Sequence, residues 1–291
     1  MFSGSIVAIV TPFSEGMIDR ERFRALVDWH IEQGTDAIVV CGTTGEAATM
    51  THEEHEGLID FAVEAVDHRR PLMAGTGSNS TAEALRLTTY AAKAGADGAL
   101  LVTPYYNKPT PRGQIEHFTT VAAAVDIPII LYNVPSRTGT NMLPSTVGEL
   151  AKVDNIIGIK EATGDMKQCS QIRELAGEDF LLISGDDFTV FPLLSIGGVG
   201  VISVVANIAP AWMHQMIERF RQGDIAGARE LHYRLFPLMR AMFIETNPIP
   251  VKTALAMMGR VEEQWRLPLC AMAPENREKL RLILEQAGLI R

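Results

Sequence analysis

Residues 155–165 read NIIGIKEATGD, a short apolar run that ends at a lysine, Lys160. An uninterrupted apolar run of this length is typical of a parallel strand that is covered on both faces. Its last residue raises a chemical question, because an ammonium group removed from water without a partner is costly. Such a lysine either reaches solvent or has its pKa lowered, so that its amine takes part in chemistry.

Seven more short runs are continuously apolar rather than alternating. They are IVAIVTP from Ile6, DAIVVCG from Asp36, PLMAGTG from Pro71, DGALLVTP from Asp97, IPIILYN from Ile127, FLLISG from Phe180 and GVGVISV from Gly198. Segments with helical periodicity lie between them, at residues 19–33, 51–67, 81–94, 113–125, 166–176 and 211–222. Eight β-α units without a linker predict an α/β fold, a closed (β/α)8 TIM barrel, which we favour over an open doubly wound sheet. No G-x-G-x-x-G motif opens a helix after a strand, so the usual sign of a dinucleotide fold is absent.

Two of the helical segments begin with the spacing of a capping box, Thr51 with Glu54 and Ser80 with Glu83. After the eighth apolar run the pattern becomes helical only, at residues 224–241, 251–259 and 274–287. The stretch NPIP, from Asn247, marks a rigid turn before one of these helices. We therefore expect a catalytic barrel over residues 1–223 and a C-terminal helical region over residues 224–291.

Composition excludes several classes of protein. The chain has 291 residues, of which 47% are hydrophobic and 21% charged, as in a globular protein with a sizeable core. A net charge of −9 without basic clusters argues against nucleic acid as a partner. The start of the chain has no basic leader and no run approaches the length of a membrane span, so we expect neither export nor membrane insertion, and a cytoplasmic location. Three separated cysteines, Cys41, Cys169 and Cys270, indicate free thiols rather than disulfides or a zinc site.

In a barrel of this kind the active site lies at the carboxyl ends of the strands. The residues that end the apolar runs are mostly polar: Thr11, Thr43, Thr44, Thr76, Gly77, Thr103, Tyr105, Tyr106, Tyr132, Asn133, Lys160, Gly185, Asp186 and Ser203. No histidine ends a run and one aspartate cannot hold a divalent ion, so we expect no metal. His52 and His55 are three residues apart, which misses the spacing of a zinc-protease motif, and we interpret them at this point as helix-face histidines.

Lys160 is the candidate nucleophile of this ring. In a confined pocket desolvation favours the neutral amine, which can form an imine with a carbonyl substrate and acidify the adjacent carbon. An ion pair with Glu161 is the structural alternative, but adjacent strand residues point to opposite faces. Lys252 is the rival lysine, although at helical spacing its charge can reach solvent and it ends no strand. Cys41 could be a nucleophile as well, but a small buried residue fits its apolar run better.

Imine chemistry also needs groups that move protons and bind acidic substrates. Tyr132 ends the neighbouring strand and is either a proton carrier or an amphipathic residue at the barrel mouth. Arg137 suits a carboxylate bound through two oxygens, or is a surface arginine. The threonines of GTTG, Thr43 and Thr44, offer hydroxyl and N–H groups just before a helix, where a small carboxylate would bind.

Taken together the motifs resemble those of the 4-hydroxy-tetrahydrodipicolinate synthase family. They are GTTGE at Gly42, YYN at Tyr105, YNVPSRTG at Tyr132, GIKEATGD at Gly158, SGDD at Ser184 and GVISV at Gly200. The resemblance runs from GSIVAIVTP near the start to NPIPVK near the end, so it covers essentially the whole chain. It implies a (β/α)8 barrel with a C-terminal helical region and a homotetramer built as a dimer of dimers.

The implied reaction condenses pyruvate with L-aspartate 4-semialdehyde in the diaminopimelate route to lysine, without a cofactor. The resemblance makes Lys160 the Schiff-base lysine, assisted by Tyr132. Thr43 would link Tyr132 to Tyr106 in a hydroxyl relay, with Tyr106 supplied by a neighbouring subunit.

The resemblance also assigns binding residues. Thr44 would bind the pyruvate carboxylate and Arg137 the semialdehyde carboxylate, while the main chain at Gly185 and Ile202 would line the pocket. Five residues match the positions at which L-lysine inhibits some members at a subunit interface: His52, His55, Asn79, Glu83 and Tyr105. One departure is Ala47, where inhibited members often have serine, so the resemblance does not fix the strength of inhibition.

Two alternatives remain at this point. A lyase or aldolase of the same superfamily, acting on N-acetylneuraminate or a 2-keto-3-deoxy sugar acid, would share Lys160 and Tyr132. Such an enzyme has little use for a carboxylate-binding arginine at Arg137, so the synthase is favoured. A catalytically silent barrel that binds pyruvate or lysine is the other alternative, and it fits poorly with the presence of all these groups together.

Overall fold

Eight parallel strands close into a barrel in the computed structural model, which describes residues 2–291. The barrel strands are β1 (Gly4–Ala8), β4 (Ala37–Val40), β5 (Leu72–Gly75), β6 (Gly98–Val102), β7 (Ile129–Asn133), β8 (Ile156–Glu161), β9 (Leu181–Ser184) and β10 (Gly200–Ser203). Each strand pairs with its neighbours in chain order and β1 pairs with β10, which closes the circle. Each of the eight apolar runs overlaps one of these strands, so the predicted TIM barrel is confirmed.

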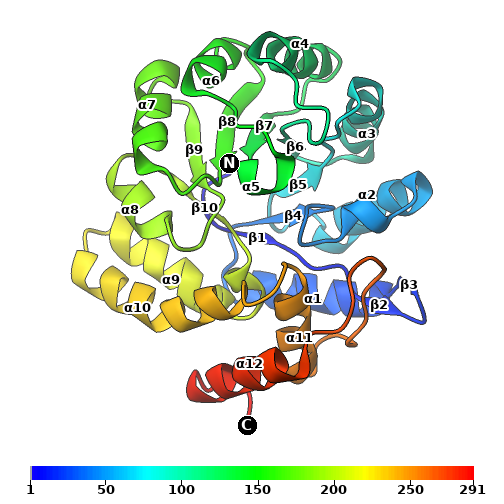
Figure 1. Cartoon of the computed structure of the whole chain (residues 1–291), viewed down its shortest axis with the longest axis vertical. Helices are drawn as coiled ribbons and strands as arrows, with labels where there is room; N and C mark the ends of the chain where they lie inside the picture. Colours follow the sequence, from blue (N-terminus) through cyan, green and yellow to red (C-terminus); the bar gives the residue numbers. More distant parts are fainter. Residues whose placement is uncertain (1) are drawn as a thin grey trace.

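Helices surround the barrel, as Figure 1 shows. They are α1 (Arg20–Glu32), α2 (His52–Val66), α3 (Thr81–Ala94), α4 (Pro111–Ala122), α6 (Pro144–Leu150), α7 (Met166–Ala176), α8 (Val190–Ser195) and α9 (Pro210–Arg221). Shorter helices are η1 (Ala47–Thr49), α5 (Pro135–Thr138) and η2 (Val205–Asn207). The six helical segments predicted by range are all present, whereas the short helices lack enough turns to show a periodicity in the sequence.

One of the two predicted capping boxes is present. At the start of α2, Oγ1 of Thr51 accepts from N of Glu54 at 3.2 Å, and Oε2 of Glu54 accepts from N of Thr51 at 3.0 Å. At the start of α3 the prediction is wrong, because the Ser80 side chain makes no cap. The carboxylate of Glu83 accepts instead from the hydroxyl group of Ser78.

Side chains of alternate strand positions form an apolar cluster inside the barrel. Its buried members are Phe2, Ile6, Ala8, Ala37, Val39, Met73, Leu100, Ile130, Tyr132, Val134, Ile183 and Ile202. The parallel register sets Tyr132 of β7 opposite Lys160 of β8. Since Tyr132 belongs to the interior cluster, this register brings Lys160 to the same face, at the carboxyl end of the barrel.

The C-terminal helical region consists of α10 (Ile225–Ala241), α11 (Ile249–Met257) and α12 (Pro274–Gln286), at the lower edge of Figure 1. One apolar cluster contains Ile9 near β1, Leu235 of α10 and Leu280 of α12, so this region shares its core with the barrel. A hairpin of β2 (Phe13–Ser14) and β3 (Met17–Ile18) was not predicted, because strands of two residues leave no pattern. Across residues 2–291, no helix is both long and apolar enough to cross a membrane.

Candidate active site

A cavity of about 740 Å³ opens at the carboxyl ends of the barrel strands. Most of the predicted site residues line it: Thr43, Thr44, His52, His55, Glu83, Tyr105, Tyr132, Arg137, Lys160 and Gly185. Tyr106, Asn79 and Ile202 are not among the lining residues. The cavity therefore joins the predicted substrate residues and most of the predicted lysine-binding residues in one space.

Lys160 is almost buried at the end of β8, with 7% of its surface exposed. Its Nζ atom lies 4.1 Å from the centroid of the Tyr132 ring. The pKa of Lys160 is lowered to about 7, mainly by burial; the Asp187 carboxylate opposes this shift and the Arg137 charge adds to it. Near neutral pH a large share of this amine is therefore unprotonated and nucleophilic.

The alternative ion pair between Lys160 and Glu161 does not form, because the carboxylate of Glu161 is bound on the other side of the strand. It accepts from Nδ2 of Asn133 at 2.9 Å, from Nε2 of Gln168 at 3.2 Å and from N of Thr163 at 2.8 Å. The predicted opposite orientation of these neighbouring residues is confirmed. The position of Lys160 is thus not explained by a structural salt bridge.

Tyr132 is buried beside Lys160, and burial raises the pKa of its phenol. The nearby Arg137 charge and the Thr43 hydroxyl group act in the opposite direction. The Thr43 hydroxyl group is thus close to the Tyr132 phenol, as the predicted relay requires. Tyr106 is 89% exposed and is not among the residues that line the cavity, so the second link is not made within residues 2–291 of one chain.

Asp187 is a buried acidic group that the sequence analysis missed. Its Oδ1 atom accepts from Oγ of Ser203 at 2.5 Å, and Oδ2 accepts from N of Val204 at 3.1 Å and N of Val205 at 3.0 Å. Burial raises the pKa of Asp187 to about 6, against these hydrogen bonds. Its position after Asp186 in SGDD was the available signal, but only the first of the two acids ends the apolar run.

Asn247 connects the two candidate carboxylate-binding residues. Its Nδ2 atom donates to Oγ1 of Thr44 at 3.0 Å, and its carbonyl oxygen accepts from Nη2 of Arg137 at 3.1 Å. Arg137 belongs to the short helix α5, directly after β7. The NPIP stretch, interpreted from the sequence as a turn, thus also contributes a residue to the wall of the cavity.

The expectation that the charge of Lys252 reaches solvent is wrong. Its Nζ atom lies 2.6 Å from Oε1 of Glu46, and both side chains are fully buried. Helix α11 is buried on several sides, including Val251, Thr253 and Leu255, so helical spacing gives Lys252 no path to water. Burial lowers the pKa of Lys252, and the carboxylate of Glu46 opposes that shift. This lysine is a structural partner of the loop that follows β4.

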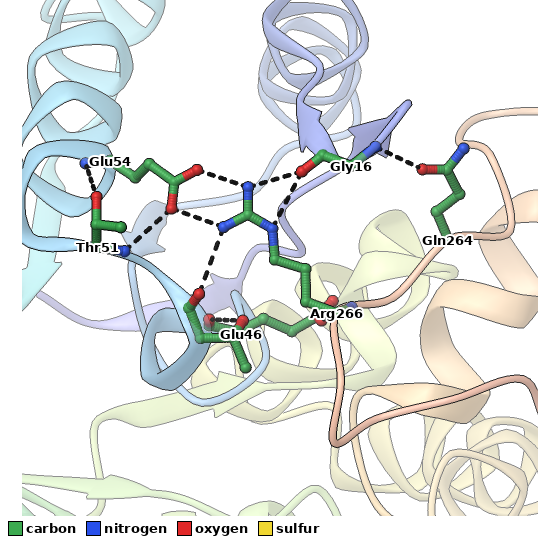
Figure 2. Close-up of polar contacts among 7 residues, drawn as sticks. Gly16, Glu46, Thr51, Glu54, Gln264 and Arg266 are labelled. Carbon is green, nitrogen blue, oxygen red and sulfur yellow. Dashed lines mark hydrogen bonds and ion pairs between the residues drawn. The ribbon is translucent and has the colours of Figure 1, made fainter.

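Arg266 fixes the same loop from a second direction, as Figure 2 shows. Its guanidinium donates to both carboxylate oxygens of Glu54, at 2.7 and 2.6 Å, and to the carbonyl oxygen of Gly16 at 2.8 Å. Its backbone N donates to Oε2 of Glu46 at 3.4 Å. Glu46 has a left-handed φ of 57°, which favours glycine, so Lys252 and Arg266 hold strained backbone in place next to Thr43 and Thr44.

Four of the five predicted lysine-binding residues lie near the start of α2 or α3, and Tyr105 lies in the loop after β6. Nε2 of His52 lies 3.5 Å from Oε1 of Glu83, and Nε2 of His55 lies 2.9 Å from the carbonyl oxygen of Gly75. Burial lowers the pKa of His55. The backbone carbonyl oxygen of Asn79 accepts from Nδ2 of Asn107 at 2.8 Å.

Other predicted residues have simpler surroundings. Cys41 is 3% exposed and burial raises the pKa of its thiol, which suits the small buried residue rather than the nucleophile. Ile202 is 1% exposed within the interior cluster. At Gly185, a Cβ atom would lie 2.7 Å from Cβ of Ala162 and 3.1 Å from Cγ of Lys160, so glycine leaves room for the lysine. Over residues 2–291 no three His, Cys, Asp or Glu side chains are placed to hold a metal ion.

Comparison with known proteins gives one consistent result. The model of the dihydrodipicolinate synthetase family matches residues 1–287. The 4-hydroxy-tetrahydrodipicolinate synthase of Thermodesulfovibrio yellowstonii is 57% identical over 291 residues, which is 100% of both chains. The crystal structure of dihydrodipicolinate synthase from Aquifex aeolicus has a TM-score of 0.98 at 51% identity and covers 99% of each chain.

Two similar structures carry bound small molecules. The chloride-inhibited dihydrodipicolinate synthase of Acinetobacter baumannii, solved with pyruvate, has a TM-score of 0.97 at 46% identity over 100% of both chains. The enzyme of Cyanidioschyzon merolae, solved with lysine bound, has a TM-score of 0.97 at 42% identity over 99% of both chains.

Fold and pocket define a (β/α)8-barrel enzyme with a cavity, lined by the buried Lys160, at the carboxyl ends of its strands. More specifically, the chain belongs to the dihydrodipicolinate synthetase family. Its activity is that of a 4-hydroxy-tetrahydrodipicolinate synthase, a lyase of lysine biosynthesis that uses pyruvate, as the sequence predicted. The alternative of an N-acetylneuraminate or sugar-acid lyase is set aside by these matches.

Proposed function

We propose that Lys160 performs this synthase reaction by forming an imine with pyruvate. The observation that carries the proposal is the buried amine at the barrel mouth, whose pKa of about 7 leaves much of it neutral. The amine attacks the keto carbon of pyruvate, the carbonyl oxygen takes up a proton, and water leaves as the imine forms. The protonated imine then withdraws electrons, so the methyl group loses a proton and becomes an enamine.

The enamine carbon forms the new bond with the aldehyde carbon of L-aspartate 4-semialdehyde. The aldehyde oxygen takes up a proton and becomes the hydroxyl group of the product. The amino group of the semialdehyde then attacks the imine carbon, closes the ring and releases Lys160. Because the lysine itself supplies the electron sink, we expect no cofactor.

Tyr132 is the proposed proton carrier for these steps, since it lies next to Lys160 and close to the Thr43 hydroxyl group. We expect Tyr106 of a neighbouring subunit to complete the relay, and its 89% exposure in the single chain agrees with that role. This part of the proposal includes the homotetramer. Tyr106→Phe should then lower kcat without changing the sedimentation coefficient, and a monomeric wild-type protein would contradict it.

Thr44 is proposed to bind the pyruvate carboxylate and Arg137 the semialdehyde carboxylate, with Gly185 and Ile202 contributing main-chain contacts. Thr44 and Arg137 line the cavity, as Lys160 does, and Arg137 supplies a planar donor pair for a carboxylate. Ile202 supports the proposal least, because its side chain lies in the barrel interior.

We further propose that L-lysine inhibits the enzyme at His52, His55, Asn79, Glu83 and Tyr105. Support comes from the negative charge of Glu83 beside His52, which suits an ammonium group, and from the cavity that these residues share with Lys160. Activity measured against millimolar lysine tests the proposal, and unchanged activity contradicts it. Because Ala47 stands where inhibited members often have serine, the same titration also measures how strongly lysine inhibits.

The cytoplasm is the proposed location of the reaction.

Borohydride trapping tests the central step. Reduction in the presence of pyruvate should add a stable 1-carboxyethyl group to the peptide that contains Lys160, detected by mass spectrometry. Lys252 is the internal control, because it is also buried with a lowered pKa but is paired with Glu46 and lies away from the cavity lining. Lys160→Arg should give no adduct and no activity. An adduct on Lys252, or none at all in the wild-type protein, would contradict the proposal.

A further inference from the structure

Asn247 lies between α10 and α11, far from the strand ends in sequence, yet it is buried in the wall of the active-site cavity. Only 5% of its surface is exposed. Its side-chain amide donates to Oγ1 of Thr44 at 3.0 Å, across 203 residues of sequence. Its backbone carbonyl oxygen accepts from Nη2 of Arg137 at 3.1 Å. One residue of the C-terminal region therefore contacts both groups that are candidates for binding substrate carboxylates.

The direction of the hydrogen bond with Thr44 decides what that hydroxyl group can do. A threonine hydroxyl has one hydrogen to donate and can accept through its lone pairs. Because Oγ1 of Thr44 accepts from the Asn247 amide, its hydrogen is not used in that contact and is left for another acceptor. Thr44 lines the cavity, so this hydrogen is available to a carboxylate bound there.

A second observation sets Asn247 apart from an ordinary structural asparagine. Within residues 2–291 its Oδ1 atom is buried without a hydrogen-bond partner. A buried carbonyl oxygen that lost its water and found no partner destabilises the fold, and an apolar side chain of the same size would not carry that penalty. The stability of the fold therefore does not account for an amide at this position.

We propose that Asn247 is a positioning residue for pyruvate: its side-chain amide holds the Thr44 hydroxyl as a donor toward the pyruvate carboxylate. Its backbone carbonyl at the same time anchors Arg137, which places the two carboxylate subsites at a fixed separation. This inference rests on the role proposed above for Thr44, and the experiment separates the two.

Asn247→Leu removes the amide while keeping the size of the side chain and the backbone carbonyl. We expect the KM for pyruvate to rise about tenfold or more, as for loss of a well-placed hydrogen bond to a charged group. The KM for the semialdehyde should change less, because the backbone contact with Arg137 remains. Asn247→Asp is the second variant, in which the Thr44 hydroxyl donates to the new carboxylate and is lost to pyruvate, so the same rise is expected.

A double-mutant cycle with Thr44→Val shows whether Asn247 acts through Thr44. Asn247→Leu should raise the KM for pyruvate when Thr44 is present and have little further effect in the Thr44→Val background. Fully additive effects would overturn the inference. If Thr44→Val raises the KM but neither Asn247 variant does, the inference fails while the role of Thr44 stands. If Thr44→Val leaves the KM unchanged, both fail.

Thermal unfolding supplies a readout that distinguishes positioning from structure. Asn155→Leu is the matched control, since the amide of Asn155 donates to the carbonyl oxygens of Ala122 and Val125 at 2.9 and 2.8 Å, before β8 begins. This control should lower Tm and leave the KM for pyruvate unchanged. Asn247→Leu should do the opposite, with Tm unchanged or higher. A fall in Tm without a change in KM would make Asn247 a structural residue and overturn the inference.

Discussion

The ammonium nitrogen of Lys252 lies 2.6 Å from a carboxylate oxygen of Glu46, and neither side chain has any exposed surface. Glu46 belongs to the loop that carries Thr43 and Thr44, whereas Lys252 belongs to α11 of the C-terminal region. The pair thus ties this region to one wall of the active site. Because both charges are buried, loss of one partner strongly destabilises the protein by leaving the other charge unpaired in an apolar space.

Removal of Lys252 alone should therefore destabilise the protein strongly. We expect Lys252→Met to lower the free energy of unfolding by about 3–5 kcal/mol, the usual cost of an unpaired buried charge. Lys252→Met combined with Glu46→Gln should recover part of that loss. Arg24→Met is the control, because Arg24 pairs with Glu64 at 2.6 Å on the surface and should cost at most about 1 kcal/mol. Denaturant titrations measure all four proteins, and equal losses for the two single variants would contradict this account.

The activity should depend on pH through Lys160. With its pKa lowered to about 7, the protonated amine accumulates as the pH falls below that value, so kcat/KM for pyruvate should fall on the acid side. The Asp187 carboxylate opposes the lowering of this pKa, so Asp187→Asn should lower it further and move the acid limb to lower pH. A pH–rate profile of both proteins tests this. An acid limb that stays in place or moves to higher pH would show that Asp187 does not act on Lys160.

Gly185 should be needed for the geometry of Lys160. A Cβ atom at this position would lie 2.7 Å from Cβ of Ala162 and 3.1 Å from Cγ of Lys160, closer than side-chain carbons normally approach. Gly185→Ala should therefore displace the lysine and lower kcat by about tenfold or more, since small misplacements at a reacting centre are costly. Gly57→Ala in α2 is the control, where the added Cβ meets only Nη2 of Arg20 at 3.7 Å. Steady-state kinetics should show normal kcat for that control.

Arg266 should rigidify the start of α2. Its planar group contacts Glu54 and the carbonyl oxygen of Gly16 at once, which a lysine cannot reproduce. Arg266→Lys should lower the free energy of unfolding by roughly 1 kcal/mol and increase hydrogen exchange in residues 47–55. Arg277→Lys, which alters the pair of Arg277 with Glu263, is the control and should leave exchange in that segment unchanged.

The barrel and the position of Lys160 could be predicted because both depend on local sequence patterns. Parallel strands covered on two faces need continuous apolar runs, and the candidate site residues stand at or just after their ends, so Lys160, Tyr132 and Thr43 could be proposed from their positions alone. The family motifs then supplied roles that spacing could not. Asp187 comes one residue after the end of its apolar run, so inspection of the run ends did not select it. Its contacts with Ser203 and the following backbone depend on how β9 and β10 end.

No local sequence pattern indicated the contacts of the C-terminal region. Lys252 looked like a surface lysine because helical periodicity describes one helix and not what packs around it, and α11 is covered on several sides. Asn247 meets Thr44 across 203 residues, and no local pattern joins two such positions. The failed cap at Ser80 has a similar origin, since Ser78 competes for the carboxylate of Glu83.

Order of synthesis gives the placement of these ties a further meaning. Lys160 and Tyr132 leave the ribosome well before Asn247, Lys252 and Arg266. A growing polypeptide thus holds this buried amine before the residues that brace the cavity wall have been made. Assembly of the complete cavity is thereby deferred until residues 247–266 have been translated.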